Sequence, residues 1–163
     1  MNHIISVLVE NKSGVLAKIS GLFSRRGFNI ESLAVGPTED EKIARITIVV
    51  NTDEDSVEQV TKQLHKLINV LKIQKLDPSY SVQRELVLVK VNTENKNRAE
   101  ILEIANIFRA NVVDVTKSSI MFELTGASTK ISAFEDLLKP YGILEFVSTG
   151  MIACQRGKKN QSI

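Results

Sequence analysis

The sequence predicts an α+β protein built from two tandem ferredoxin-like βαββαβ domains. Apolar residues follow strand and helix spacings in the order strand, helix, strand, strand, helix, strand. The same order occurs a second time along the 163 residues, after a short polar segment that contains a proline. Each such unit forms an antiparallel sheet with its helices on one face, so the other face needs a cover or a partner.

The first half of the chain carries an apolar stripe for each of its two expected helices. The stripes consist of Val15, Leu16, Ile19, Leu22 and Phe23 in the first helix, and of Val57, Val60, Leu64, Leu67 and Ile68 in the second. The side chain of Asp53 suits the N-cap of the second helix. In chain order we expect strand 3–10, helix 15–26, strand 29–35, strand 43–50, a helix from Asp53 and strand 70–75.

The strands of this half are indicated by β-branched residues and by the residues that end them. Residues 43–50 are rich in isoleucine and valine and form the clearest strand of the chain. Gly36 and Pro37 are expected to end the preceding strand, because proline has no N–H to continue a hydrogen-bonded ladder. We therefore expect residues 1–76 to form the first domain and residues 77–81 to form a linker.

The second half repeats the pattern. Ile101, Leu102, Ala105 and Phe108 lie on one face of its first helix, and Pro140 and Gly142 end its second helix. The expected elements are strand 86–91, helix 98–108, strand 112–116, strand 120–124, helix 129–138 and a strand from residue 143 onward. We expect residues 82–157 to form the C-terminal ferredoxin-like domain and the polar residues 158–163 to form a disordered tail.

Charge and composition argue against a nucleic-acid binder and against a membrane protein. Lys and Arg total 21 and Asp and Glu total 19, and much of the net charge of +2 comes from Arg156, Lys158 and Lys159. No basic face is evident, and no apolar run approaches the roughly 20 residues of a transmembrane helix. The N-terminus lacks a basic signal region, and the one cysteine, Cys154, cannot form an internal disulfide. We therefore expect a cytoplasmic protein.

The turn between the first strand and the first helix is the strongest candidate for a binding site. It consists of the polar residues Asn11, Lys12 and Ser13 and of Gly14. A helix start leaves backbone N–H groups without intrahelical partners, and the helix dipole adds partial positive charge, so such a turn suits an anion. No acid, base or nucleophile accompanies the turn, which indicates that a small ligand is held without being transformed.

Motifs for RNA binding and for metal binding are incomplete. Arg26-Gly27-Phe28 resembles part of an RNA-recognition motif, but it precedes the second strand, and strand 43–50 contains no aromatic residue. Metal carriers of this fold need paired soft ligands, whereas Cys154 stands alone and His3 and His65 are far apart in the sequence. We expect His65 to be a solvated surface residue and Cys154 to be a small core or edge residue.

A catalytic site is not indicated either. Ser13 lies in no G-x-S-x-G elbow and has no histidine placed to activate it, so we expect it to be a helix-start residue. Glu39, Asp40 and Glu41 lie together in a loop and are expected to be solvated turn residues. A small hydrolase of this fold would therefore lack both a nucleophile and a base.

Several runs of residues resemble a known family. Residues 11–16, together with Asn29 and Ile30, are similar to the ACT domain, the amino-acid-sensing version of this fold. The runs 8–16, 22–33 and 63–70, together with Arg84-Glu85-Leu86, Phe108-Arg109-Ala110 and Asp114-Val115-Thr116, resemble the small regulatory subunit of acetohydroxyacid synthase (acetolactate synthase). The resemblance covers the chain up to about Gly157 and implies that the first domain is an ACT domain.

The resemblance implies a regulatory subunit with no activity and no cofactor of its own. Its partner in that family is a catalytic large subunit, which carries thiamine diphosphate, FAD and magnesium and makes acetolactate and acetohydroxybutyrate. The small subunit raises this activity and confers allosteric feedback inhibition by valine, or by leucine or isoleucine, in branched-chain amino acid biosynthesis. The implied location is the cytoplasm, or the plastid stroma for a plastid-encoded or processed chain.

The resemblance also implies where the effector lies. The ACT domains pair side by side as a homodimer, with the effector at their interface. The implied effector-binding residues are Asn11, Lys12, Ser13, Gly14, Val15, Leu16, Asn29 and Ile30, the last two reaching the effector from the partner chain. We do not expect the loop 36–41 to matter to this site, and we expect no catalytic residue and no metal ligand.

These residue types also suit a valine zwitterion on physical grounds. Backbone N–H groups at Gly14 would bind its carboxylate, and the side-chain oxygens of Asn11 and Asn29 would bind its ammonium group. Val15, Leu16 and Ile30 would form an apolar wall for its side chain. The alternative is a free-standing ACT-domain amino-acid sensor that acts on another partner, and copurification of a large thiamine-dependent subunit would decide between the two.

Overall fold

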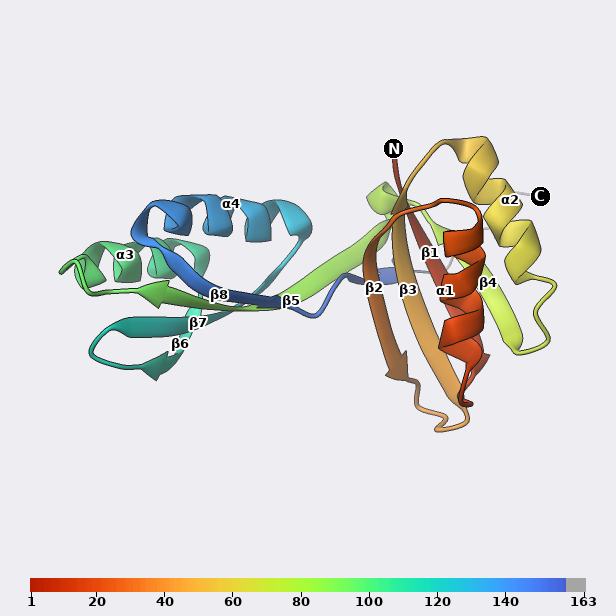
Figure 1. The fold of residues 1–163 in the computed structure, drawn as a ribbon, viewed down its shortest axis with the longest axis horizontal. Helices are drawn as coiled ribbons and strands as arrows, with labels where there is room; N and C mark the ends of the chain where they lie inside the picture. Colours follow the sequence, from red (N-terminus) through yellow and green to blue (C-terminus); the bar gives the residue numbers. More distant parts are fainter. Residues whose placement is uncertain (158–163) are drawn as a thin grey trace. The chain divides into compact units, whose positions relative to one another are not determined.

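In this computed structural model, which describes residues 1–157, the chain divides into two compact units (Figure 1). Among the described residues, the first unit consists of Met1–Val82 together with residues 151–157, and the second consists of Gln83–Gly150. Each unit contains an antiparallel sheet with two helices, which confirms the predicted α+β fold class. The expected disordered tail, residues 158–163, lies outside the described residues. Within residues 1–157, no helix is long and apolar enough to cross a membrane.

The first unit is built around a sheet with the strand order β2-β3-β1-β4. In chain order its main elements are β1 (Asn2–Glu10), α1 (Val15–Arg25), β2 (Ile30–Pro37), β3 (Ile43–Asn51), α2 (Glu54–Leu64) and β4 (Val70–Leu76). Alternate residues of β1 and β3 face both helices, so that Ile5, Ile48 and Phe23 share one buried core. The two helices lie on one face of the sheet (Figure 1).

β2 continues through Gly36 and Pro37, where the sequence predicted its end. Pro37 pairs with Ala44 of β3. β2 is an edge strand of its sheet, and an edge strand tolerates proline because the missing N–H can lie on the side without a neighbour. The prediction that Gly36 and Pro37 break the ladder is therefore wrong.

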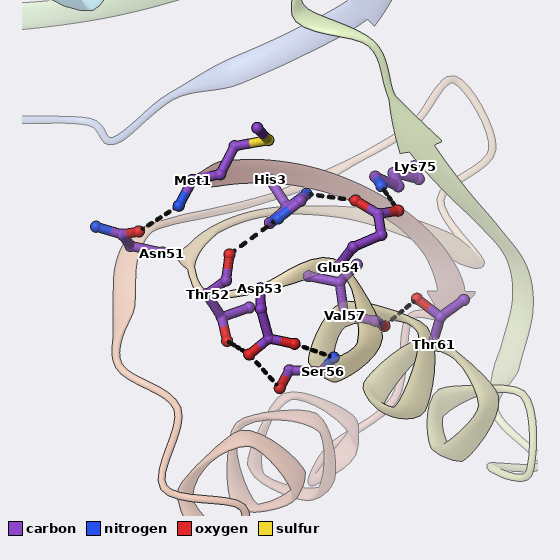
Figure 2. Close-up of polar contacts among 10 residues, drawn as sticks. All are labelled: Met1, His3, Asn51, Thr52, Asp53, Glu54, Ser56, Val57, Thr61 and Lys75. Atoms are coloured by element: carbon purple, nitrogen blue, oxygen red, sulfur yellow. Dashed lines mark hydrogen bonds and ion pairs between the residues drawn. The ribbon is translucent and has the colours of Figure 1, made fainter.

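α2 begins as predicted but ends earlier than its apolar stripe indicated. Asp53 is the N-cap, and its Oδ1 accepts the Ser56 N–H at 2.8 Å (Figure 2). The helix ends at Leu64, and a tight turn follows, in which the Leu67 N–H donates to the Leu64 carbonyl. Ile68 lies beyond this turn with 92% of its surface exposed, so its placement in the buried stripe is wrong.

The expected linker 77–81 is largely ordered as a short 3₁₀ turn. The turn spans Pro78–Tyr80, and the side chain of Asp77 accepts the Ser79 N–H at 2.8 Å. Strand β5 (Ser81–Asn92) follows directly and is longer than the predicted strand 86–91.

The second unit repeats the arrangement with the strand order β6-β7-β5-β8. After β5 its elements are α3 (Arg98–Phe108), β6 (Asn111–Val115), β7 (Ser119–Gly126), α4 (Ser128–Leu138), a 3₁₀ turn (Lys139–Tyr141) and β8 (Ile143–Ser148). Its core joins α3 and α4 to one face of the sheet, and the rings of Phe122 and Phe134 meet edge to face with centroids 6.2 Å apart.

A further strand, β9 (Ile152–Gln155), pairs with β5 and is grouped with the first unit. Ala153 is buried in a cluster with Ile4, Val49 and Leu76, on the sheet face that points away from α1 and α2. The Met151 N–H donates to the Ser32 hydroxyl at 2.7 Å. Residues 151–157 thus pack with the first unit, because strands β1, β3 and β4 form the apolar patch that covers Ala153.

Candidate functional site

The start of α1 presents unoccupied backbone donors. Gly14 is the N-cap, with φ +82° and ψ −9°, a left-handed conformation that favours glycine. No hydrogen bond within residues 1–157 occupies the backbone N–H groups of Ser13, Gly14 and Leu16. A Cβ placed on Gly14 would meet no atom within 4 Å, so the space beside this residue is open. This geometry fits the anion-binding turn that the sequence predicts.

Ser13 does not start the helix in the way that its capping preference predicted. The N-cap position is taken by Gly14, and no side chain caps the helix. The prediction of Ser13 as the capping residue is therefore wrong. An uncapped helix start leaves more N–H donors for a ligand than a capped one.

Asn11 ties the turn to the loop between β2 and β3. Its side-chain amide donates to the Glu41 carbonyl at 2.9 Å, and its backbone N–H donates to the Lys42 carbonyl at 2.8 Å. The loop 36–41, which we did not expect to matter to this site, thus holds the Asn11 side chain through the Glu41 carbonyl. This contact joins residues 30 positions apart, and local sequence spacing carries no signal for it.

The charges around the turn are balanced by Glu10, which the sequence reasoning did not single out. Its carboxylate accepts from Lys12 Nζ at 2.8 Å and from Asn69 Nδ2 at 3.1 Å. The hydrogen bond from Lys12, followed by that from Asn69, lowers the pKa of Glu10 below its usual value. Lys18 Nζ in turn donates to the Asn69 side chain at 3.4 Å. Lys12 thus offsets the negative charge beside the helix start.

The predicted apolar wall is divided between core and surface. Val15 is only 4% exposed and packs in the core of the first unit, so its side chain cannot line an open site. Leu16 is 40% exposed beside the turn, and Ile30 is half-buried against the core. Leu16 and Ile30 remain available to contact a ligand, while Val15 contributes only its backbone.

Asn29 and Ile30 lie at the other end of the sheet from the turn. In the register of the strands, Glu10 pairs with Ile43 of β3, whereas Ile30 pairs with Val50 of β3. Positions 43 and 50 are separated by roughly 23 Å at about 3.3 Å per residue. One chain therefore does not bring the two groups of predicted site residues together.

A second polar cluster, which the sequence reasoning missed, lies where β1 begins (Figure 2). The buried His3 contacts the Thr52 carbonyl through Nε2 at 3.1 Å and Glu54 Oε2 through Nδ1 at 3.7 Å. Lys75 pairs with the same carboxylate, and this hydrogen bond is the main cause that lowers the pKa of Glu54. Within the described residues, no group of three or more potential ligands could hold a metal ion. The cluster ties β1 to α2 and β4.

His65 and Cys154 are both exposed. The prediction of His65 as a surface residue is therefore confirmed, and Cys154 lies on the short strand β9.

Nearly the whole chain is similar to proteins of one kind. The family described as the small subunit of acetolactate synthase matches residues 84–157, and the AHAS small subunit-like ACT domain matches residues 5–72. A probable acetolactate synthase small subunit of Archaeoglobus fulgidus is 54% identical over 159 residues, which are 98% of this chain and 99% of the relative. An acetolactate synthase small subunit of Mycobacterium bovis is 51% identical over 157 residues, 96% of this chain and 94% of the relative.

A solved structure shares the fold over the same length. The crystal structure of an acetolactate synthase small subunit from Thermotoga maritima matches with a TM-score of 0.90 and 39% identity. The match covers 97% of this chain and 99% of that one.

Proposed function

This chain belongs to the family of acetolactate synthase small subunits, and on that premise we propose that it activates the catalytic subunit and confers feedback inhibition by valine. The family matches confirm the resemblance read from the sequence, and they make the chain a regulatory subunit with an ACT domain. Activation, the identity of the effector and the position of its site are the proposed part. The observation that carries the proposal is the open helix start at Gly14, with its free N–H donors.

The proposed site is shared between two chains. The turn 11–16 and the pair Asn29 and Ile30 lie at opposite ends of one sheet, so a site that uses both needs a second copy. β2 is an exposed edge strand, and two copies of β2 can pair antiparallel about a two-fold axis. Such pairing would bring Ile30 of one chain to the sheet end where Pro37 and Asn11 of the other chain lie. It would also cover one exposed edge on each chain.

The chemistry of this shared site matches a small amino acid. The N–H groups of Ser13 and Gly14 would bind the carboxylate, and the side-chain oxygens of Asn11 and the partner chain's Asn29 would bind the ammonium group. Each charge-assisted hydrogen bond contributes about 1.5–3 kcal/mol, and burial of an isopropyl group contributes about as much. After the loss of rigid-body freedom, a Kd between roughly micromolar and millimolar remains.

The catalytic chemistry is assigned to the partner. The family implies a large subunit that carries thiamine diphosphate, FAD and magnesium, and this chain would act on it through contacts rather than through a cofactor of its own. We assign effector binding to the first domain and contacts with the catalytic subunit to the second. The second domain lacks the Asn and Gly constellation, since its first turn, residues 92–97, contains no glycine.

The experiment that tests the proposal is a valine titration followed by reconstitution. Valine is titrated calorimetrically into the purified chain, and the chain is then added to a purified catalytic large subunit while acetolactate formation is measured. We expect valine to bind with a micromolar to millimolar Kd, the chain to raise the activity, and valine to lower it again. A chain that binds valine but leaves the activity unchanged would instead be a free-standing sensor.

A further inference from the structure

Within the second unit itself, residues 83–150, one face of the sheet has no cover. Both α3 and α4 pack on the opposite face, in the core around Phe122 and Phe134 (Figure 1). The corresponding face of the first unit carries β9 over Ile4, Val49 and Leu76. An antiparallel sheet with apolar residues on an uncovered face is typical of a surface that meets a partner.

The uncovered face is hollowed at its centre. The hollow has a volume of about 110 Å³ and is lined by Leu88, Lys90, Met121, Glu145 and Val147. These residues share the face because Leu88 pairs with Val147, and Lys90 pairs with both Met121 and Glu145, across neighbouring strands. One water molecule needs about 10–15 Å³ of such volume, so the hollow is large enough to admit an apolar side chain.

The rim of the hollow is acidic on one side. Lys90 Nζ and Glu145 Oε2 neutralise each other at 3.0 Å. On the side of β6 and β7, Glu123 pairs in register with Leu88 and Asp114 with Met121, so both carboxylates lie on this face. Neither of them forms an ion pair within the described part of the chain. The face therefore carries three negative side chains around an apolar centre, against the positive Lys90 and, farther along β5, Arg84.

We propose that this face is the docking surface for the catalytic subunit, and that it receives an apolar side chain flanked by one or more arginine or lysine residues. The apolar side chain would enter the hollow between Leu88, Met121 and Val147, and the basic residue would meet Glu123 and Asp114. This inference rests on the proposed function, because it names the surface through which the second domain would act.

The charge distribution favours a different protein over a second copy of this chain. A two-fold contact of the face with itself would set these carboxylates against a surface of the same net negative charge, because Lys90 is already paired with Glu145. Like charges at such a contact are unfavourable, whereas a basic partner surface is complementary. The occupant is therefore a protein surface with the opposite charge.

The test measures the affinity of full-length variants for the purified catalytic subunit. Met121→Glu places a charge in the hollow, and Glu123→Lys reverses the acidic rim. Ile107→Glu is the matched control, because Ile107 is 76% exposed on α3, which packs on the opposite face of the sheet. We expect the Kd to rise about tenfold or more for Met121→Glu and Glu123→Lys, and less than about twofold for Ile107→Glu. Valine binding to each isolated chain should match that of the parent.

Each outcome bears on a different claim. If the parent chain itself does not bind the catalytic subunit, the proposed function fails. If the parent binds and both face variants bind equally well, the docking surface is misplaced although the function stands. If a face variant alters the sedimentation of the chain alone, the face joins two copies and the inference is overturned. Should Met121→Glu fail to fold, the affinity of Glu123→Lys alone tests the docking surface, since this variant changes only a charge on the rim.

Discussion

At the scale of single residues, Gly14 combines two properties that a binding turn needs. Its φ of +82° is accessible to glycine with little strain, and the space beside it is empty. The backbone of the turn can therefore approach a ligand closely. The nearby Val15 has the opposite environment, since its side chain is buried in the core. The two residues are neighbours in the sequence, but only Gly14 has open space beside it.

We predict that Gly14→Asp abolishes valine binding and feedback inhibition while the fold and much of the activation remain. Two like charges about 4 Å apart repel by about 4 kcal/mol at an effective dielectric of about 20, before screening. A millimolar ligand binds with a free energy of about 4.1 kcal/mol, so the repulsion alone removes binding of that strength. Calorimetry on the isolated chain measures the first effect, and a valine titration of the reconstituted enzyme measures the second.

Gly14→Asn is the matched control for this change. Asparagine has nearly the same size as aspartate and tolerates the left-handed region, but it carries no charge. We expect it to weaken valine binding far less than aspartate does. Equal losses for both variants would show that backbone strain rather than charge is responsible, and full valine sensitivity of Gly14→Asp would show that the site is misplaced.

Asn29→Ala should act more mildly. The side chain of Asn29 is exposed in the structure, so its removal leaves the core unchanged. The loss of one hydrogen bond to the effector costs about 1 kcal/mol, which weakens binding severalfold without abolishing it. The calorimetric Kd for valine measures the change, and an unaltered Kd would remove Asn29 from the site.

At the scale of elements, the N-cap of α2 makes stability depend on pH. The hydrogen bond from the Ser56 N–H, followed by that from the Ser56 hydroxyl, lowers the pKa of Asp53 in the folded state (Figure 2). A lowered folded-state pKa means that the stabilisation is present above the unfolded value, near 3.8, and is lost as the pH falls through the folded value. The contribution is therefore complete at neutral pH and disappears in acid.

We predict that Asp53→Ala lowers the urea midpoint of unfolding at pH 7, and that the difference from the parent chain is smaller at a pH below 3.8, the ordinary pKa of this carboxyl group. Asp55→Ala is the control, because Asp55 lies in the first turn of the same helix but does not occupy the N-cap. Unfolding followed by circular dichroism at both pH values measures the effect. A difference that persists unchanged in acid would rule out the carboxylate as its source.

The strand β9 should stabilise the first unit through one small residue. Ala153 is 7% exposed among Ile4, Val49 and Leu76, whereas its neighbour Cys154 is exposed. We predict that Ala153→Asp costs at least about 2 kcal/mol of stability, because a carboxylate would be buried without a partner. Cys154→Asp should leave the melting temperature nearly unchanged. Equal melting temperatures for the two variants would mean that β9 does not cover the sheet.

The elements that the sequence predicted well are those whose pattern is local. α1 and α3 follow from apolar residues spaced every three or four positions, and the start of α2 follows from Asp53. The structure differs from the prediction where segments far apart in the sequence determine how a residue packs or pairs. The edge position of β2 permits Pro37, and an apolar patch formed by β1, β3 and β4 buries Ala153.

For the candidate site, too, the sequence indicates the local features and not the contacts between distant segments. The turn 11–14 lies within one short segment, so its residue types alone indicate an anion site. The contact between Asn11 and Glu41 and the support of Glu10 by Asn69 join segments 30 and 59 positions apart. No periodicity or motif in the sequence encodes such pairs.

At the scale of the whole molecule, the assignment of residues 151–157 to the first unit changes how the domains can be separated. A fragment that ends after Asp77 would lack β9 and would expose Ile4, Val49 and Leu76. The proposed assignment of effector binding to the first domain and of catalytic-subunit contacts to the second is therefore best tested in the full chain. Variants at Gly14 change the first unit, and variants at Met121 change the second.

We propose that the second chain of a dimer completes each effector site, and mixing two inactive variants tests this most directly. Gly14→Asp disables the turn, and Asn29→Lys places a positive charge beside the effector ammonium group. In a mixed dimer, one site would carry both changes and the other would carry neither. Either variant alone should therefore fail to bind valine. Random mixing makes about half of the dimers mixed, each with one intact site of two, so about a quarter of the parent's valine sites should return with the parent Kd. If the mixture binds no more valine than the separate variants, the turn and Asn29 do not form a site shared between chains.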